Sequence, residues 1–287
     1  MEVGGVYNSS LRPWACIAER LLSLLPPVQP GNCKYSDLKY GVENNGVKVT
    51  YPDASVCEAP SVKLPQDPNL VNIGLGLNPG LSFGSAVYGK EAGKTYKAAQ
   101  FHIHSSSEHT IDGQFFEAEL HIVHLQESMT GVTLIDDLLV GTGLDGSRGA
   151  SVVGFMIKSD ATATNAMFEN LLYGFETAGC GVLSGNVNGA SADAFNPYNF
   201  LASDTCIYNY DGGLTTPTCD EIVEWNLASK PISVTPNQMS RLLALINGCP
   251  QSIAFNGSTS RPTQPLNGRK INKICAHRRR NLRTAEN

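Results

Sequence analysis

Short segments in which apolar and polar residues alternate recur along this chain of 287 residues, and turn-forming residues separate them. Four clear examples are "VKVTY" (47–51), "YKAAQFHIH" (96–104), "FFEAELHIVHL" (115–125) and "SVVGFMIK" (151–158). Because successive side chains of a β-strand point to opposite faces, alternation with a period of two indicates strands. Gly, Asn, Asp and Pro between the segments provide the turns. We therefore predict a predominantly β protein with few helices.

Two segments have helical periodicity instead. In "TPNQMSRLLALING", Thr235 and Gln238 can form a capping box, and Pro236 takes the first helical position. In "ATNAMFENLLYGFETAG", the apolar residues recur on one face and Gly179 ends the helix. The apolar stripes are Met239, Leu242, Leu243 and Ile246 in the first, and Met167, Phe168, Leu171, Leu172 and Phe175 in the second. We expect both helices to cover a sheet from its periphery.

Composition limits the classes of partner. Charged residues make up 16% of the chain and the formal net charge is −5, which argues against a nucleic-acid-binding surface. There is no internal repeat and no linker, which favours one domain. The run "LLSLLPPVQP" (21–30) is too short to span a bilayer and contains prolines, so we expect no transmembrane segment. The sequence does not indicate an oligomeric state.

Eight cysteines are scattered along the chain without a CxxC pair. Their even number and wide spacing favour disulfides over metal ligation, and so an oxidising compartment: secreted, periplasmic or lumenal. Two N-glycosylation tripeptides, at Asn8 and Asn256, fit the same route. The first residues have no apolar signal-peptide core, so we expect a leader to be absent from this sequence. The cysteines are Cys16, Cys33, Cys57, Cys180, Cys206, Cys219, Cys249 and Cys275.

Five of the six histidines lie in one segment, "QFHIHSSSEHTIDGQFFEAELHIVH" (100–124). On a strand, His102 and His104 share a face, and on the following strand His121 lies on a face with Glu119. If the two strands are antiparallel neighbours, three imidazoles meet. Three histidines with a fourth position open are typical of a catalytic zinc site, where the cation lowers the pKa of water towards neutrality.

Ligand imidazoles usually donate their second N–H group to an acceptor, and Gln100 and Glu119 lie on the same faces as His102 and His121. A histidine on a strand is otherwise more often a hydrogen-bonded core residue, and we assign His109 and His124 to that class. A solvated sheet face could also carry histidines, so the spacing alone leaves the metal site one of several interpretations.

The histidine segment resembles the zinc-binding signature of the alpha-type carbonic anhydrases. Downstream, "YDGGLTTPTCDEIVEW" (210–225) resembles the Leu-Thr-Thr-Pro segment of that family, and "RPTQPLNGR" (261–269) resembles its C-terminal motif. The resemblance implies one domain over residues 1–269, built on a large, twisted, mostly antiparallel central sheet with peripheral helices. Residues 270–287 are then a basic tail. The algal delta type is similar around the histidines, so both branches stay open.

The resemblance also implies roles for individual residues. Zn²⁺, for which cobalt or cadmium can substitute, would be bound by His102, His104 and His121, with Gln100 and Glu119 orienting the first and third ligands. Thr215 would accept a hydrogen bond from the zinc-bound hydroxide and donate its own proton to Glu108. The residues implied to surround carbon dioxide are Val123, Val152, Leu214, Thr216 and Trp225. For the four apolar ones, plain core packing is an equally good interpretation.

The implied reaction is the reversible hydration of carbon dioxide to bicarbonate and a proton, by attack of zinc hydroxide. Fast members of the family carry a proton-shuttling histidine directly after "NNG", where this chain has Val47. We therefore expect turnover limited by proton transfer. The N-terminal third also diverges, because the family's Gln-Ser-Pro-Ile stretch is missing. Secreted relatives link an N-terminal cysteine to the position of Cys219, and the sequence does not select the partner.

Two alternative functions use the same residues. A catalytically silent carbonic-anhydrase-like binding module would have lost a ligand histidine, and this chain has lost none. A zinc-dependent esterase is the second alternative, since a metal hydroxide attacks many electrophiles. A phosphoester substrate would require convergent Arg or Lys side chains, which the motif region lacks.

Overall fold

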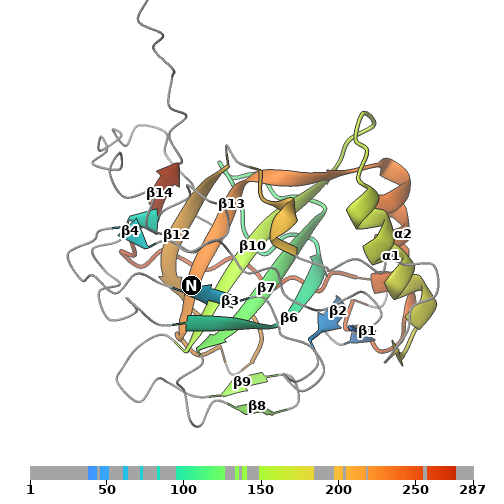
Figure 1. The fold of residues 1–287 in the computed structure, drawn as a ribbon, viewed down its shortest axis with the longest axis horizontal. Helices are drawn as coiled ribbons and strands as arrows, with labels where there is room; N and C mark the ends of the chain where they lie inside the picture. The colour runs from blue at the N-terminus through green and yellow to red at the C-terminus, as the bar shows by residue number, and fades with distance from the viewer. Residues whose placement is uncertain are drawn as a thin grey trace, which may run out of the picture.

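The computed structural model describes residues 38–43, 46–51, 61–63, 72–73, 83–84, 95–126, 133–135, 138–140, 149–183, 197–202, 205–217, 219–254 and 257–275. Most of these residues belong to one ten-stranded sheet, which twists across the molecule (Figure 1). Among its described pairings only β10 with β13 is parallel. The predicted fold class is therefore confirmed.

The order of strands across the sheet is β11-β1-β2-β6-β7-β10-β13-β12-β14, and β3 pairs with β6 beside this path. Two small hairpins, β4 with β5 and β8 with β9, lie outside the sheet. The strands in chain order are β1 (Lys39–Glu43), β2 (Gly46–Thr50), β3 (Ser61–Lys63), β4 (Asn72–Ile73), β5 (Phe83–Gly84), β6 (Thr95–Ser105), β7 (Ala118–Gln126), β8 (Thr133–Ile135), β9 (Leu138–Val140), β10 (Ala150–Ser159), β11 (Val182–Leu183), β12 (Cys206–Gly212), β13 (Val223–Val234) and β14 (Asn272–Cys275).

The C-terminal part of the domain extends further than the sequence predicted. Residues 272–275, which we assigned to a basic tail, form β14 and pair antiparallel with β12, with Cys206 opposite Cys275. The alternation in "NKIC" is too short to be recognised as a strand before its partner is known. Residues 276–287, both glycosylation tripeptide asparagines and the three N-terminal cysteines lie outside the described residues.

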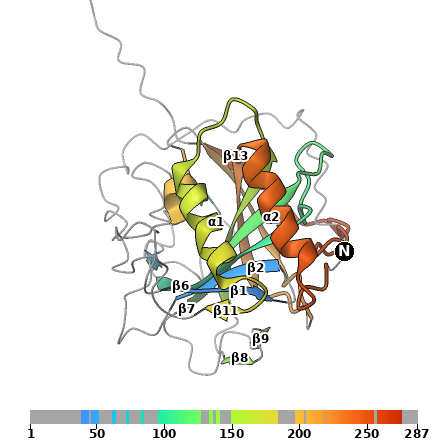
Figure 2. The same ribbon diagram turned by 90° about the vertical axis from the view of Figure 1, so that its right-hand side faces the viewer.

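Two helices cover one face of the sheet. Helices α1 (Ala166–Ala178) and α2 (Pro236–Gly248) lie side by side (Figure 2), and α2 contacts β2, β6 and β10. Their predicted signals are present: Thr235 and Gln238 form a capping box, and Gly179 follows α1 with φ of 59°. The apolar stripes of both helices pack into a core with the sheet side chains beneath them. None of the described helices is both long and apolar enough to cross a bilayer.

The opposite face of the sheet carries His102, His104 and His121. The pairing of β2 with β6 shows which β2 residues share that face. Val47 lies opposite Ile103, and both are fully buried in the core on the helix side. Lys48 lies opposite His102, so these two share the other face. Gly46 before them has φ of +116°, and a Cβ there would lie 2.1 Å from the Ile103 carbonyl oxygen, so the strand turn requires glycine.

His124 lies on the helix side of the sheet, as strand parity predicts. Its Nδ1 donates to the Ser151 carbonyl at 3.0 Å, and its Nε2 accepts from the hydroxyl of Tyr198, which belongs to the 3-10 helix η2 (Pro197–Phe200). The rings of His124 and Tyr198 are stacked at 13°. Both contacts suit the neutral imidazole, and burial lowers the pKa of His124 to about 4.

This buried histidine predicts a loss of stability in weak acid. The unfolded chain takes up a proton near pH 6.5, whereas folded His124 does so only near pH 4, so stability present above pH 6.5 is lost between those values. The contribution is about 3 kcal/mol. Urea unfolding of wild type and His124→Gln at pH 7 and pH 4.5 measures it. Equal pH dependence in the two proteins would contradict the assignment.

Candidate metal centre

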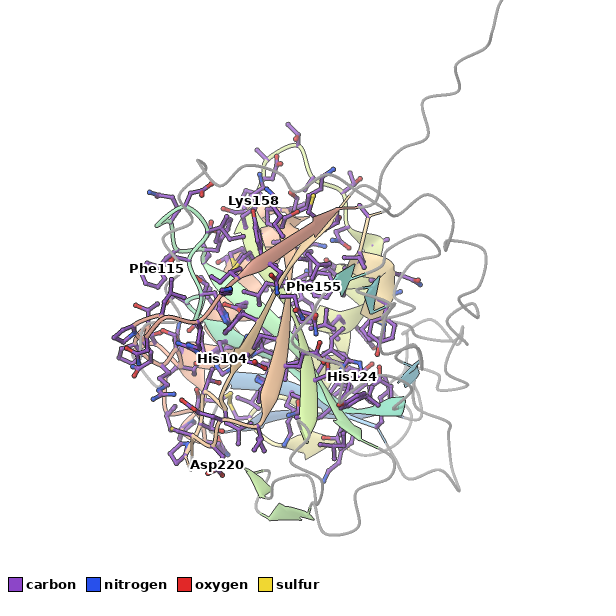
Figure 3. All side chains as sticks on the ribbon, turned by 90° about the vertical axis from the view of Figure 1, so that its left-hand side faces the viewer. His104, Phe115, His124, Phe155, Lys158 and Asp220 are labelled. Carbon is purple, nitrogen blue, oxygen red and sulfur yellow. A yellow bond between two sulfur atoms is a disulfide. The ribbon has the colours of Figure 1, made fainter. Side chains whose placement is uncertain are left out.

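Three histidines converge on the face of the sheet opposite the helices. His102 and His104 extend from β6, and His121 lies directly opposite His102 on β7. Figure 3 views the molecule from the side away from the helices, with His104 among the central strands. One ring nitrogen from each of the three histidines lies within 4.8 Å of the others. The predicted convergence of three imidazoles is present.

The amide oxygen of Gln100 and a carboxylate oxygen of Glu119 determine which nitrogen of the His102 and His121 rings faces the centre of the site. His102 Nδ1 donates to Gln100 Oε1 at 2.8 Å, and His121 Nε2 donates to Glu119 Oε1 at 2.7 Å. The remaining nitrogens, His102 Nε2 and His121 Nδ1, lie 3.3 Å apart. Both predicted neighbours are thus placed as expected, and each leaves a lone pair directed at the other ring.

Glu119 is the most heavily bonded group of the site. Its carboxylate is fully buried and accepts four hydrogen bonds, from the backbone N–H groups of Glu108 and His109 and from the side chains of His109 and His121. His109 in turn contacts the Tyr210 hydroxyl through Nε2 at 2.6 Å. His109 is a buried, hydrogen-bonded residue as predicted, but its role in holding Glu119 was not predicted. Strand parity could not reveal it, because His109 lies in the turn after β6.

A glycine gives these groups room. Gly154 on β10 lies opposite His121, and a Cβ at this position would lie 2.5 Å from Leu227 Cδ2 and 3.3 Å from Glu119 Oε1. The Leu227 side chain would have to shift, and the approach to Glu119 would be tight, so a larger residue at position 154 would crowd the buried carboxylate.

Burial determines the protonation of the site. Loss of solvent lowers the pKa of His102 well below its usual value, and the neighbouring His104, His121 and Lys48 lower it further. Burial also lowers the pKa of His104, although Glu108 opposes this shift. Burial alone would raise the pKa of Glu119, but His109 and His121 outweigh it and bring it well below the usual range. His102 and His104 are therefore neutral bases beside a charged carboxylate.

These residues fit a small divalent cation. Tetrahedral coordination at about 2.0–2.1 Å places two imidazole nitrogens about 3.3 Å apart, which is the separation of His102 Nε2 and His121 Nδ1. His104 Nε2 is buried and makes no hydrogen bond, and the same is true of Glu108 Oε2. Orphaned buried lone pairs that converge on one point are uncommon unless a ligand satisfies them. Metal ligands must be deprotonated, as His102 and His104 already are. Burial lowers the pKa of His121, but Glu119 outweighs it and raises that pKa, so His121 would lose a proton when it binds a metal.

Glu108 is placed differently from its implied role. Its Oε1 accepts from the Arg261 backbone N–H at 2.8 Å, and its Oε2 lies 3.4 Å from His104 Nε2 and 3.8 Å from His121 Nδ1. The implied hydrogen bond from Thr215 is not made in this structure, since Oε2 has no hydrogen-bond partner. The Arg261 side chain donates to the Leu214 carbonyl at 3.2 Å and so ties the loop next to Thr215 to Glu108.

The four predicted apolar wall residues belong to one buried cluster on the histidine face. Val152 lies opposite Val123 on one side and Trp225 on the other, and Leu214 packs with them. The Trp225 ring lies 4.8 Å from the His121 ring, centroid to centroid. The apolar cluster therefore adjoins the imidazoles directly. Thr216 is half-buried in the same loop, and its carbonyl accepts from the Cys219 backbone N–H.

The model of the eukaryotic-type carbonic anhydrases matches residues 31–275, which is most of the chain. The chain belongs to the carbonic anhydrase family. Among curated proteins it is 33% identical over 186 residues to "Putative carbonic anhydrase 5" of Caenorhabditis elegans, covering 61% of this chain and 54% of that protein. It is 30% identical over 184 residues to a carbonic anhydrase of Nostoc, covering 64% and 56%. The chain thus spans little more than half of the length of either relative.

Solved carbonic anhydrases share the fold. A halotolerant enzyme from Dunaliella salina matches with a TM-score of 0.53 and 26% identity, covering 83% of this chain and 72% of that one. The alpha-type enzyme from Thermovibrio ammonificans, solved with the inhibitor sulfanilamide, matches with a TM-score of 0.51 and 22% identity, covering 86% and 80%. The family model supports the alpha type, and these solved structures share its fold.

The disulfides of this carbonic anhydrase differ from the pairing that the resemblance implied. Cys219 is a free, half-buried thiol. A disulfide instead joins Cys180, which follows α1, to Cys249, which follows α2, and Cys206 is also disulfide-bonded. The sequence could not select among the pairings because the distances between cysteines are set only when the sheet and helices assemble.

Proposed function

We propose that this carbonic anhydrase is a zinc enzyme that catalyses the reversible hydration of carbon dioxide to bicarbonate and a proton. The observation that carries the proposal is the separation of 3.3 Å between two imidazole nitrogens, beside the orphaned nitrogen of His104. When bound, zinc would act as a Lewis acid that supplies hydroxide near neutral pH. Cobalt or cadmium would also fit three imidazoles.

We assign different roles to the residues of the site. The three histidines would hold the metal, while Gln100 and Glu119 keep two of the rings in the orientation that directs a lone pair inward. The negative charge of Glu119 makes His121 a stronger base and hence a stronger ligand. We propose that Thr215 and Glu108 orient the reacting hydroxyl group, with Thr216 beside them, as the resemblance implies.

The apolar cluster fits the substrate. Carbon dioxide is small and uncharged, and the side chains of Val123, Val152, Leu214 and Trp225 offer it a site without competing hydrogen bonds. An uncharged molecule needs no charged side chains to bind it. A phosphorylated substrate would fit this wall poorly.

The experiment is carbon dioxide hydration by zinc-loaded protein, with His121→Ala and a buffer blank as controls. We expect one zinc per chain and hydration well above the blank in wild type, and neither in His121→Ala. A wild type that binds one zinc but matches the blank would be a binding module. A wild type that binds no zinc would overturn the metal site itself.

We propose that turnover is limited by proton transfer. The position after "NNG" is Val47, whose side chain cannot carry a proton and is buried on the helix side of the sheet. Imidazole-type buffers, which carry protons in solution, should therefore raise turnover with increasing concentration. A high turnover that does not depend on buffer would contradict this proposal.

A histidine placed at position 47 should not restore a shuttle. Val47→His would bury an imidazole in the core on the face opposite the site, with an expected loss of about 3 kcal/mol of unfolding free energy. Turnover at low buffer concentration should not exceed that of wild type. Val47→Leu, which stays apolar, is the control and should lose less stability. A stable Val47→His protein with buffer-independent turnover would mean that position 47 faces the site.

We also propose that the protein resides in an oxidising compartment, secreted, periplasmic or lumenal, with carbon dioxide and bicarbonate as its small-molecule partners. The disulfide between Cys180 and Cys249 supports this, since such bonds are rare in reducing cytosol. Thiol alkylation of the native protein, followed by mass spectrometry, should modify Cys219 and leave Cys180 and Cys249 unmodified. Modification of all three would contradict the proposal.

A further inference from the structure

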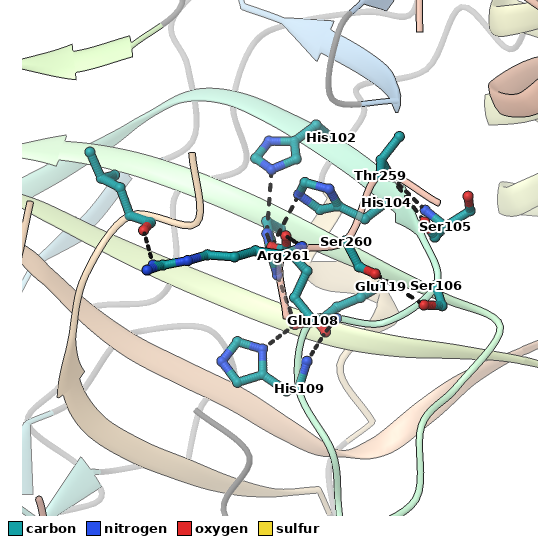
Figure 4. A network of polar contacts seen from close by, with 12 residues as sticks. His102, His104, Ser105, Ser106, Glu108, His109, Glu119, Thr259, Ser260 and Arg261 are labelled. Atoms are coloured by element: carbon teal, nitrogen blue, oxygen red, sulfur yellow. Dashed lines mark hydrogen bonds and ion pairs between the residues drawn. The ribbon is translucent and has the colours of Figure 1, made fainter. Parts of the chain in front are cut away.

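A group of hydroxyl side chains joins two distant segments of the chain beside the metal centre. Ser258, Thr259 and Ser260, which we call the hydroxyl clamp, contact Ser105 and Ser106, the residues directly after His104. Figure 4 shows Thr259 and Ser260 beside these two serines. The two segments are about 150 residues apart in sequence. Because Ser105 ends β6, the clamp holds the chain where it leaves the sheet towards Glu108.

The contacts of the clamp are mostly to backbone groups, so they fix the path of the chain. Thr259 Oγ1 accepts from the Ser105 N–H at 3.0 Å, and the Thr259 N–H donates to the Ser105 carbonyl at 2.6 Å. Ser258 Oγ donates to the same carbonyl at 2.6 Å and accepts from the Ser106 N–H at 3.1 Å. The Ser106 and Ser260 hydroxyls lie 3.2 Å apart. Thr259 is 5% exposed, so solvent cannot replace its contacts.

Arg261, the residue after Ser260, connects the clamp to the metal centre. The Arg261 backbone N–H donates to Glu108 Oε1 at 2.8 Å, and Glu108 Oε2 then lies against ring nitrogens of His104 and His121. Glu108 itself is 4% exposed. Since the clamp fixes the backbone before Arg261 as well as the backbone before Glu108, it sets the position of one relative to the other.

We propose that the hydroxyl clamp is a positioning element, in which Thr259 and its two serine neighbours hold the Glu108 carboxylate at the metal centre through the Arg261 N–H. The hydroxyl groups of the clamp bond to Ser105, Ser106 and one another. A positioning role predicts that loss of a clamp hydroxyl acts only through Glu108. The kinetic consequence rests on the proposed function, whereas the structural consequence does not.

The structural arm is amide hydrogen exchange of the metal-free protein, followed by NMR. Thr259→Val, which keeps the shape but loses the hydroxyl, should speed exchange of the Arg261 N–H about tenfold, and Thr259→Ser should restore the wild-type rate. Thr162→Val removes a surface hydroxyl that donates to Asp160, and is the matched control with no expected change. Unchanged exchange at Arg261 in Thr259→Val would overturn the proposal. Should that variant fail to fold, Ser260→Ala takes its place.

The kinetic arm is a double-mutant cycle with zinc-loaded protein. Thr259→Val should lower kcat for carbon dioxide hydration about tenfold while zinc affinity changes less than threefold. In a Glu108→Ala background the same change should have no further effect, because the group it positions is gone. An equal loss in both backgrounds would overturn positioning through Glu108. Absence of hydration in wild type would count against the proposed function and leave the exchange result to decide the clamp.

Discussion

Glu119→Leu is expected to lose about 5 kcal/mol of unfolding free energy and to weaken zinc binding by about a hundredfold. The reason is that four donors, two backbone N–H groups and two imidazole nitrogens, would be left in the protein interior without their acceptor. Loss of the carboxylate also frees the His121 ring to turn. Urea unfolding and zinc titration against a chromophoric chelator measure the two effects.

Glu117→Leu is the matched control for this change. Glu117 lies two residues away and is exposed, and it accepts hydrogen bonds from Ser159. Its replacement should change stability by less than about 1 kcal/mol and leave zinc affinity unaltered. Similar losses of unfolding free energy and zinc affinity in both variants would mean that the four hydrogen bonds of Glu119 contribute nothing specific.

Removal of the Cys180–Cys249 disulfide, by replacing both cysteines with serine, should lower the free energy of unfolding by about 4 kcal/mol. The bond closes a loop over a sequence separation of 69 residues and ties the end of α1 to the end of α2. Without it the unfolded chain gains conformational freedom, while the folded helices keep their packing against the sheet. Zinc affinity should change less than twofold because the centre lies on the other face of the sheet.

Cys219→Ser separates the disulfide effect from a general effect of cysteine replacement. Cys219 is a free thiol, so its loss should leave the urea midpoint nearly unchanged. If the double serine variant unfolded at the same urea concentration as wild type, the two helix ends would be held by packing alone.

Much of the fold was predictable because local rules agree with the final contacts. The capping box at Thr235, the stop at Gly179 and the alternation around His102 each describe a short segment whose preferred state does not change on assembly. Strand parity also placed Gln100 beside the His102 ring and Glu119 beside the His121 ring. The prediction of a tail after residue 269 missed β14, because this strand is short and gains its stability from its pairing with β12 rather than from its own sequence.

The site was predictable only in part. Parity identified the three imidazoles, but the partners that hold them come from distant segments. Tyr210 reaches His109 across 101 residues, and Arg261 reaches Glu108 across 153 residues. No periodicity in the sequence relates such positions. Position 47 illustrates the same limit, because the motif drew attention to Val47 whereas the register places Lys48 on the face of His102.

The sequence by itself determined the kind of secondary structure, the start of α2, the end of α1 and the set of three histidines, since these depend on side-chain periodicity and local capping within a few residues. Only the tertiary structure decided which groups hold Glu108 and His109 in place, which cysteines are bonded and which face each residue of β2 presents. Those properties depend on register and on distances between segments far apart in the chain, which are set when the sheet pairs its strands and buries its faces.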